Sequence, residues 1–257
     1  MPKVSVIMPS YNASSYLETA VYSLFGQSFT DWELLLVDDC SKDNSPEIAK
    51  ALEKKDKRIR FIQKEFNSGS ADTRNTGIRN ANGEYIAFLD SDDVWDSDFL
   101  SSMVDHMQKF NSPFSFASYR IIDEEGTEFC EPFLVGDKKY GYRDVLFYNR
   151  VGLLTAMYHV PTVGKKYFDP SLKSLRDDYA LWLDILKESK FAYGNSKILA
   201  SYRVRRGAAT SNKKKVMLAH FRMLRNREKL GFISAFSLTL IHGFFGLLKY
   251  RTKRIQN

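Results

Sequence analysis

Short apolar runs alternate with stretches of helical periodicity along the first part of the chain. The runs are almost continuously apolar, which is typical of strands buried in a parallel sheet. The stretches between them carry apolar residues at helical spacing, with Ser14 or Ser15 as an N-cap and Pro46 in a first turn. We predict strands at 3–8, 32–39, 59–63 and 84–90, and helices at 14–27, 45–55 and 70–83. This order predicts an α/β fold, a mostly parallel sheet with helices on both faces.

The second part of the chain is less regular. Its patterns predict helices at 98–110 and 174–189 and strands at 114–123, 153–160 and 195–204. No internal repeat is visible, so we expect these elements to complete the same domain.

The C-terminal segment has a different character. A basic helix is predicted at 213–231, followed by an uncharged stretch at 231–248 and a basic cluster from Lys249 to Arg254. Eighteen residues are near the lower limit for crossing a bilayer, for which about 20 are typical. On a helical wheel, one side carries Ile233, Phe236, Leu240, Phe244, Leu247 and Leu248, and the other carries Ala235, Thr239, His242, Gly243 and Gly246. This amphipathic tail favours a helix lying in the membrane surface, with a helix packed into the core as the alternative.

Charge is unevenly distributed along the chain. The segment from Arg203 to Asn257 holds 14 basic residues and one acid, whereas the rest holds 24 basic and 30 acidic residues. An acidic body with a basic tail indicates that the tail meets anions. Two cysteines without CxxC spacing argue against a disulfide framework or a zinc site. The N-terminal residues show no signal-peptide pattern, so we expect a cytoplasmic protein.

Acidic residues follow two of the predicted parallel strands. Asp38 and Asp39 end the second strand, and Asp90, Asp92 and Asp93 follow the fourth. Ligands of open α/β sheets bind outside the carboxyl ends of the strands, so we expect these carboxylates to share one site. They would repel a bare phosphate, but they would hold Mg²⁺ or Mn²⁺ between protein and phosphate. Glycine-rich phosphate loops and HExxH are absent, which excludes dinucleotide-binding and Walker-type sites.

Four segments resemble the inverting family-2 glycosyltransferases with the GT-A fold. They are VSVIMPSYN, WELLLVDDCSKD, ADTRNTGIRNANGEYIAFLDSDD and RDDYALWL, in the family's order and spacing from about Val4 to Val204. The resemblance implies a GT-A domain at 1–204, with a nucleotide-binding half at 1–95 and an acceptor half at 96–204. A membrane-associating tail would follow at 205–257. The resemblance also implies a nucleotide-diphosphate sugar donor and a divalent metal.

The resemblance places the nucleotide-sugar site at Pro9, Tyr11, Asp39, Arg74, Asp90, Ser91 and Asp92. In it, Tyr11 offers an aromatic face to the base and Asp39 accepts a hydrogen bond from the uracil N3–H. Asp90 approaches the ribose, and Asp92 ligates the metal within a DxD motif. Simpler roles remain open: Asp38, Asp39 and Asp93 as helix caps, Tyr11 as packing, Arg74 as a solvated helix residue and Asp92 as a plain loop acid.

An inverting transfer also needs a carboxylate that takes the proton of the acceptor hydroxyl. Asp177 and Asp178 stand near the start of a predicted helix, where the helix dipole favours the ionised form. The family carries Glu-Asp at this point and this chain carries Asp-Asp. The match makes Asp178 the expected base, with Asp177 and helix capping as alternatives. Trp182 is expected to floor the acceptor site, with core packing as the alternative.

The segment SYRVRRG resembles the YRxH segment that lies near the diphosphate in this family. Arg203 matches the arginine, and Arg205 stands where the family has a histidine. A permanent cation at either position suits the phosphates, and the alternative is that these arginines begin the basic tail.

Together these features predict a metal-assisted inverting glycosyltransferase, a hexosyl- or N-acetylhexosaminyltransferase. It would move a sugar from a UDP-sugar to a lipid-linked or surface-glycan acceptor, as a peripheral protein on the cytoplasmic face of the cell membrane. Nucleic acid is not an expected partner, because the body is acidic. The alternative is a nucleotidyltransferase or nucleotide-sugar hydrolase with the same metal–nucleotide site, although PSYNASS lacks the glycine-rich signature of a nucleotidyltransferase.

Overall fold

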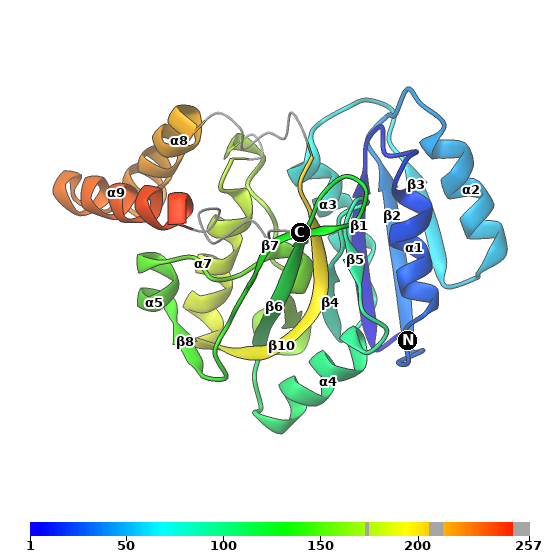
Figure 1. Cartoon of the computed structure of the whole chain (residues 1–257), viewed down its shortest axis with the longest axis horizontal. Coiled ribbons are helices and arrows are strands. Elements are labelled where there is room, and N and C mark those ends of the chain that lie inside the picture. Colours follow the sequence, from blue (N-terminus) through cyan, green and yellow to red (C-terminus); the bar gives the residue numbers. More distant parts are fainter. Residues whose placement is uncertain (173–174, 206–212, 249–257) are drawn as a thin grey trace.

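A computed structural model describes residues 1–172, 175–205 and 213–248 (Figure 1). One mixed sheet runs through the body in the order β3-β2-β1-β4-β9-β6-β10-β5, with β7 beside β6 and β8 beside β10. The strands are Val4–Ser10 (β1), Trp32–Asp38 (β2), Ile59–Gln63 (β3), Tyr85–Phe88 (β4), Val94–Trp95 (β5), Phe114–Ile122 (β6), Glu128–Phe133 (β7), Lys139–Gly141 (β8), Met157–His159 (β9) and Phe191–Arg203 (β10). The helices are Leu17–Phe25 (α1), Ser45–Lys55 (α2), Ser70–Asn80 (α3), Phe99–Lys109 (α4), Tyr142–Phe147 (α5), Val160–Val163 (α6), Asp177–Ser189 (α7), Lys213–Asn226 (α8) and Phe232–Leu248 (α9).

The first four strands form the parallel part of the sheet, as the apolar runs predict. β1 pairs in parallel with β2 and β4, and β2 pairs in parallel with β3. Alternate residues of β1 enter different buried clusters, with Val6 and Met8 on one face and Ile7 on the other. Both faces are therefore covered, which explains why the strand runs lack alternating polar positions.

Helices α1, α2 and α4 pack on one face of the sheet, and α3, α5 and α7 pack on the other. Gly77 lets α3 approach β1 closely, because a Cβ there would lie 2.7 Å from the Ile7 side chain. This close packing brings the N-terminus of α3 to the carboxyl ends of β1 and β2, where the candidate site lies.

The second half of the sheet is mostly antiparallel. β9 is inserted between β4 and β6 and runs antiparallel to both, whereas β10 runs parallel to β6. The strand predicted at 153–160 is only partly correct, since Leu153–Thr155 is a 3-10 turn. The predicted serine caps of α1 are wrong, because Tyr16 holds the N-cap position. α3 ends at Asn80 rather than at Gly83.

The tail helices α8 and α9 pack beside α5 and α7 (Figure 1). Glu228, just after α8, accepts hydrogen bonds from the Tyr142 hydroxyl at 2.6 Å and from Lys187 Nζ at 2.9 Å. Arg227 forms an ion pair with Asp184 of α7, with one nitrogen–oxygen distance of 3.0 Å. The tail therefore docks on α5 and α7 of the body through buried and half-buried polar contacts.

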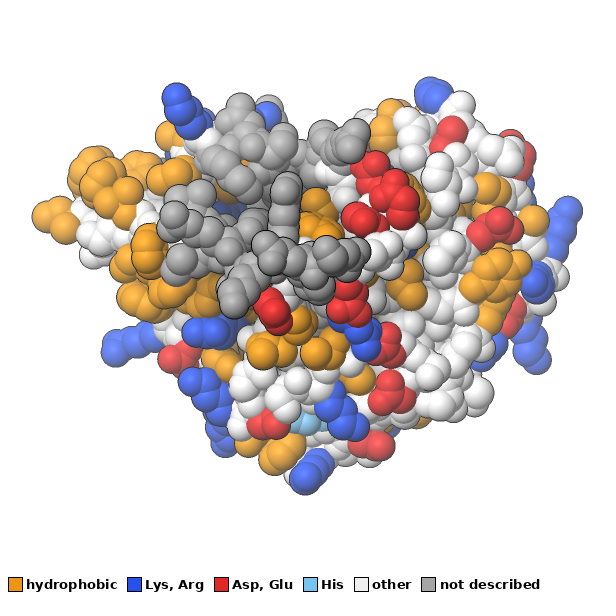
Figure 2. All heavy atoms as spheres, in the orientation of Figure 1, with side chains coloured by type: hydrophobic (Ala, Val, Ile, Leu, Met, Phe, Trp, Pro, Cys, Tyr) orange, Lys and Arg blue, Asp and Glu red, His pale blue; other side chains and the backbone are white. Residues whose placement is uncertain are grey.

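Helix α9 presents its apolar side to the outside. Its small or polar residues Ala235, Thr239 and His242 are buried against the body. The exposed apolar side chains are Phe232, Ile233, Phe236, Leu240 and Phe244, at 50–80%. Figure 2 shows apolar side chains gathered over the part of the surface that α9 forms. The wheel separates these two sides correctly. Helix α9 does pack on the body, as the core-helix alternative expects, but through its small and polar side, so that the apolar side stays exposed.

The side chains of Leu247 and Leu248 and the cluster from Lys249 to Arg254 lie outside the part of the chain that is described. Within the described ranges, no helix combines the length and the apolar character that crossing a membrane requires.

Candidate active site

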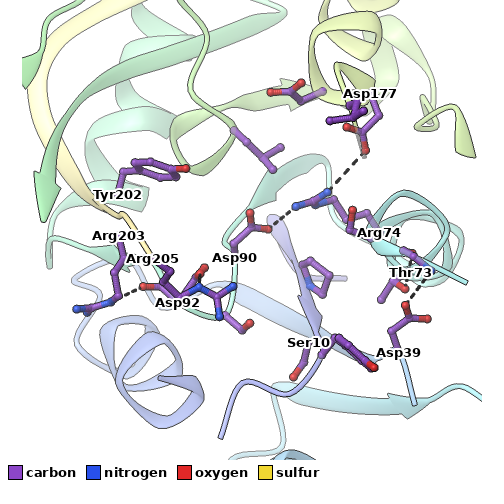
Figure 3. Close-up of a pocket in the computed structure, with 18 of the residues that line it drawn as sticks. Ser10, Asp39, Thr73, Arg74, Asp90, Asp92, Asp177, Tyr202, Arg203 and Arg205 are labelled. Carbon is purple, nitrogen blue, oxygen red and sulfur yellow. Dashed lines mark hydrogen bonds and ion pairs between the residues drawn. The ribbon is translucent and has the colours of Figure 1, made fainter. Parts of the chain in front are cut away.

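A cavity of about 600 Å³ opens at the carboxyl ends of β1, β2 and β4 (Figure 3). This volume is in the range of pockets that hold small-molecule ligands. Of the residues singled out from the sequence, the cavity wall includes Pro9, Tyr11, Asp39, Arg74, Asp90, Ser91, Asp92, Asp177, Asp178, Arg203 and Arg205. The sheet edge, the N-termini of α3 and α7 and the end of β10 therefore bring both predicted groups of residues to one site.

Asp39 is anchored at the N-terminus of α3. Its carboxylate accepts hydrogen bonds from the backbone N–H groups of Ser68 and Gly69, at 2.9 and 2.8 Å, and from Lys64 Nζ at 3.0 Å. Gly69 has a φ of 86°, a conformation that favours glycine. Although burial raises the pKa of Asp39, these hydrogen bonds outweigh it and lower the pKa. Asp39 is thus an ionised acceptor at the cavity wall.

Asp38, by contrast, serves the local turn. Its carboxylate accepts hydrogen bonds from the backbone N–H and the hydroxyl of Ser41, at 2.9 and 2.5 Å. Asp38 does not line the cavity. Of the two neighbouring acids, only Asp39 is placed to meet a ligand.

The acidic cluster after β4 suits a divalent cation. One carboxylate oxygen from each of Asp90, Asp92 and Asp93 lies within 4.8 Å of the others. Burial and then the charge of Asp90 raise the pKa of Asp92, and burial together with both neighbouring carboxylates raises that of Asp93. Oxygen donors at this spacing fit Mg²⁺ or Mn²⁺, and a cation there would relieve the repulsion.

Arg203 holds the acidic loop in place. Its backbone N–H donates to Asp93 Oδ1 at 2.9 Å, and its side chain donates to the carbonyls of Asp92, Asp123 and Glu124 at 2.9–3.0 Å. These bonds use most of its donors, so the arginine positions the loop rather than reaching for a phosphate. Asp93 likewise bonds to β10 and does not cap a helix.

Arg205 lies at the mouth of the cavity. Its Nε is 2.6 Å from Asp92 Oδ2, and its side chain is 43% exposed. Unlike Arg203, it makes no hydrogen bond to a backbone carbonyl within the described ranges. Arg205 is therefore free to turn from Asp92 toward a phosphate.

Arg74 connects the two acidic groups of the site. Its Nη2 lies 2.7 Å from Asp90 Oδ1, and its Nη1 lies 4.0 Å from Asp177 Oδ2 (Figure 3). Burial opposes its charge, but Asp90 and Asp177 outweigh burial and raise its pKa. The cation is buried and paired, so the solvated-helix alternative for Arg74 is wrong.

The two acids at the start of α7 differ in environment. Burial, followed by the charge of Asp178, raises the pKa of Asp177 to about 6. Asp177 is 5% exposed, whereas Asp178 is half-buried and accepts a hydrogen bond from the Tyr179 N–H at 2.7 Å. Asp178 therefore has freer access to the cavity, and Asp177 is the partner of Arg74.

Trp182 does not form the floor of the site. Its side chain is fully buried, stacked on Phe114 at 5.4 Å and edge-on to Phe88 at 5.9 Å. The position points into the core because it lies on the face of α7 that covers the sheet. The expectation of an acceptor-site floor is corrected to core packing.

Several lining residues were not singled out from the sequence. They are Ser10, Asn67, Gly69, Ser70, Thr73, Leu153, Leu175, Arg176, Tyr202 and Val216. Arg176 immediately precedes the acidic pair, and Tyr202 immediately precedes Arg203. Their adjacency to motif residues was the available signal, whereas Leu153 and Val216 reach the cavity only through the fold.

Two solved structures share this architecture. TarS of S. aureus in complex with UDP aligns with a TM-score of 0.70 and 22% identity, covering 92% of this chain and 69% of that one. A mannosyltransferase from Pyrobaculum calidifontis, solved with GDP-Man and Mn²⁺, aligns with a TM-score of 0.70 and 16% identity, covering 96% and 72%. This likeness confirms the GT-A fold.

Sequence comparison places the chain within that class. The model described as "Glycosyl transferase family 2" matches residues 5–150. The "Putative teichuronic acid biosynthesis glycosyltransferase TuaG" of Bacillus subtilis is 38% identical over 234 residues, 91% of this chain and 92% of its own. The "UDP-Glc:alpha-D-GlcNAc-diphosphoundecaprenol beta-1,3-glucosyltransferase WfgD" of Escherichia coli is 36% identical over 213 residues, 82% of this chain and 80% of its own. The chain therefore belongs to glycosyl transferase family 2 and is a glycosyltransferase.

Proposed function

We propose that this protein transfers a hexose or N-acetylhexosamine, with inversion, from a UDP-sugar to a saccharide carried on a lipid diphosphate. The observation that supports this most strongly is one cavity with two acidic groups joined by Arg74. The cluster after β4 suits a cation and a diphosphate, and the pair at α7 offers a base. A single displacement needs these two functions on opposite sides of one sugar.

At the donor end, Asp39 and Tyr11 bind the uracil. Asp39 has donors from the backbone and from Lys64, and Thr73 also hydrogen-bonds to it. The Thr73 hydroxyl has the Gly69 carbonyl as a second acceptor, at 2.9 Å. The Thr73 hydroxyl can therefore donate to Gly69 instead, and the uracil N3–H then donates to Asp39. Tyr11 is 48% exposed and offers a ring face to the base.

Asp92, with Asp90 and Asp93 beside it, would hold Mn²⁺ or Mg²⁺. A cation held there would supply positive charge to the diphosphate and Lewis-acid assistance to the leaving group. Arg203 keeps the loop in position, and Arg205 supplies a further positive charge to the phosphates once it leaves Asp92. Arg74 holds Asp90 toward the ribose and keeps Asp177 paired.

At the acceptor end, Asp178 takes the proton of the attacking hydroxyl. It is half-buried, lines the cavity, and carries its charge near the N-terminus of α7. Asp177 supports it through Arg74 and is less suited to the transfer, since its carboxylate is buried.

The choice of substrates is supported by the relatives. The name of the Escherichia coli protein gives UDP-glucose as donor and a diphosphoundecaprenol-linked sugar as acceptor. A second Escherichia coli relative, WfaP, has the same donor and acceptor in its name and is 29% identical over 88% of this chain. We carry these classes of donor and acceptor, but not the particular sugars, to this protein.

A lipid-linked acceptor places the reaction at a membrane surface, and α8 and α9 would hold the protein there. The exposed apolar side of α9 would enter the headgroup region. Exposed basic residues of the same segment, Lys214, Arg222 and Lys229, would meet anionic lipid. The protein would thus lie peripherally on the membrane.

Transfer is tested with a panel of UDP-sugars and Mn²⁺. We expect UDP release to rise severalfold when a lipid-diphosphate saccharide is added, with loss of the signal in EDTA. UDP release at the same rate with and without the acceptor would indicate a hydrolase. Release of pyrophosphate from a sugar phosphate and UTP would indicate a nucleotidyltransferase. Either result would replace the proposed reaction.

Membrane binding is tested by sedimentation with anionic vesicles. Changing Ile233, Phe236 and Leu240 together to serine should lower the partition coefficient at least about 10-fold, because three apolar side chains no longer leave water. Leu134→Ser, on an exposed apolar residue away from the tail, is the matched control. High salt should release only part of the wild-type protein, since it screens the charges alone. Equal sedimentation of the triple variant and wild type would exclude α9 as the anchor.

A further inference from the structure

Arg176 occupies an unusual position in the wall of the cavity. It is the N-cap residue of α7, directly before the two acids, and its backbone is left-handed, with a φ of 69°. Few residues other than glycine adopt this conformation, and asparagine and aspartate do so more often than arginine. Its side chain lines the cavity next to Asp177 and Asp178.

Arg176 is also the one arginine of the cavity wall that has no hydrogen-bond or ion-pair partner among the described residues. Arg74 pairs with Asp90 and Asp177, Arg203 bonds to carbonyls, and Arg205 pairs with Asp92. Arg176 forms no hydrogen bond or ion pair within the described ranges, and its Nε is buried. A buried donor of a charged group is costly to leave without an acceptor, so a bound anion is the expected partner of this Nε.

The surroundings of Arg176 indicate which anion this is. The donor diphosphate is already provided for by the cluster after β4, with Arg205 beside it. The charge of Arg176 acts instead on Asp178 and on His220 and His242 of the tail helices. Val216 of α8 also lines the cavity. Arg176 therefore lies between the expected base and the helices that carry the apolar outer surface.

We propose that Arg176 binds the diphosphate of the acceptor, on the lipid side of the sugar that is being extended. An acceptor of this class has its groups in the order hydroxyl, sugar, diphosphate and lipid. In the protein, Arg176 and Asp178 line the cavity together, and Val216 of α8, the helix that packs against α9, lines the same cavity. This inference rests on the proposed function, and it makes Arg176 a determinant of specificity for acceptors with a charged link between sugar and lipid.

Direct binding separates this role from catalysis. Farnesyl diphosphate is titrated by calorimetry into full-length protein saturated with UDP and Mn²⁺, with farnesol as the uncharged comparison. We expect Arg176→Gln to weaken farnesyl diphosphate binding about 10- to 100-fold, the scale of lost charged hydrogen bonds. Arg176→Lys should recover part of the affinity, because lysine keeps the positive charge but cannot donate the two parallel hydrogen bonds of a guanidinium. The dissociation constant for UDP should stay within about twofold of wild type.

Arg143→Gln is the matched control, since it removes an exposed arginine on α5 outside the cavity. A kinetic comparison uses one saccharide linked either to a lipid diphosphate or to an uncharged alkyl chain. The glutamine variant should raise KM for the diphosphate acceptor about 10- to 100-fold and leave kcat/KM for the alkyl glycoside within about threefold.

Three results would overturn the inference. They are wild-type binding of farnesyl diphosphate no tighter than farnesol, unchanged binding by Arg176→Gln, and an equal kcat/KM loss for both acceptors. The last would mean that Arg176 only supports Asp178. If the proposed function is wrong, the wild-type protein transfers no sugar to either acceptor. The comparison of farnesyl diphosphate with farnesol still measures anion binding at Arg176 in that case, so the two failures can be told apart.

Discussion

A pair of histidines joins the tail helices to α7 and predicts a pH dependence of stability. The rings of His220 and His242 lie 4.3 Å apart, and Tyr179 stacks on His220 at 5.3 Å. Both side chains are buried, and neither ring nitrogen of His220 has a hydrogen-bond partner among the described residues. Burial lowers the pKa of His220 to about 2 and that of His242 to about 4, with the charge of Arg176 acting in the same direction.

The magnitude follows from the difference between folded and unfolded chains. In the unfolded chain, a histidine has a pKa of about 6.5. Because the folded pKa values are lower, the unfolded chain binds more protons, and the free energy of unfolding falls as the pH drops below that value. When the pH falls from about 7.5 to 5.5, each histidine lowers the free energy of unfolding by roughly 1.4 kcal/mol, and the pair lowers it by about 3 kcal/mol.

His220→Phe isolates half of this effect, because it keeps an aromatic ring in the stack and removes one titrating group. The free energy of unfolding is measured from urea titrations at the two pH values. The loss between them should be about 1.4 kcal/mol smaller in the variant than in wild type. His159→Gln serves as the control, since it removes a histidine at β9 and leaves the buried pair intact.

Equal losses in wild type and His220→Phe would refute this reasoning. They would mean that His220 is not held neutral in the folded protein, and that the tail does not dock on α7 as described. A smaller effect confined to His242→Phe would assign the titration to the ring that bonds to the Leu146 carbonyl.

Three further predictions concern the reaction. Asp92→Asn should abolish metal-dependent transfer while thermal stability stays near wild type, because the loop keeps a polar side chain but loses a hard anionic ligand; activity in EDTA would contradict it. Asp178→Asn should lower kcat roughly 100-fold or more with UDP binding retained, and the reverse pattern, loss in Asp177→Asn alone, would move the base by one residue. UDP should bind more tightly than CDP, and Asp39→Asn should reduce that preference, because the cytosine N3 is an acceptor and would face a carboxylate unpaired. Asp105→Asn, an exposed acid of α4, should match wild type in all three measurements.

The sequence by itself determined the parallel half of the fold and the acidic groups at the ends of its strands. The strand at 59–63 and the helix at 45–55 have the predicted bounds. Continuous apolar runs have few alternatives to a strand covered on both faces. Acids at the ends of such strands must meet at one sheet edge, which is why Asp39, Asp90 and Asp92 line the same cavity as predicted.

The direction of the α9 faces could also be predicted from the sequence, but not what each face meets. The wheel separates apolar from small residues, whereas only packing shows that the small side is buried. Small and polar residues fit there because Thr239 bonds back to the Ala235 carbonyl and His242 bonds to the Leu146 carbonyl. The apolar side is left without a protein partner in the described part of the chain.

Only the tertiary structure decided the side of the site that α7 and β10 form. Helical periodicity cannot tell a tryptophan that faces a ligand from one that faces the sheet, and Trp182 faces the sheet. Arg74 pairs with both acidic groups, and Arg203 donates hydrogen bonds to the carbonyls of the acidic loop. Both arginines therefore contact residues far from them in sequence. Arg176 has a left-handed backbone conformation that no local sequence pattern predicts. These contacts depend on how α7, β10 and the tail helices pack against one another, and sequence spacing carries no information about packing at such separations.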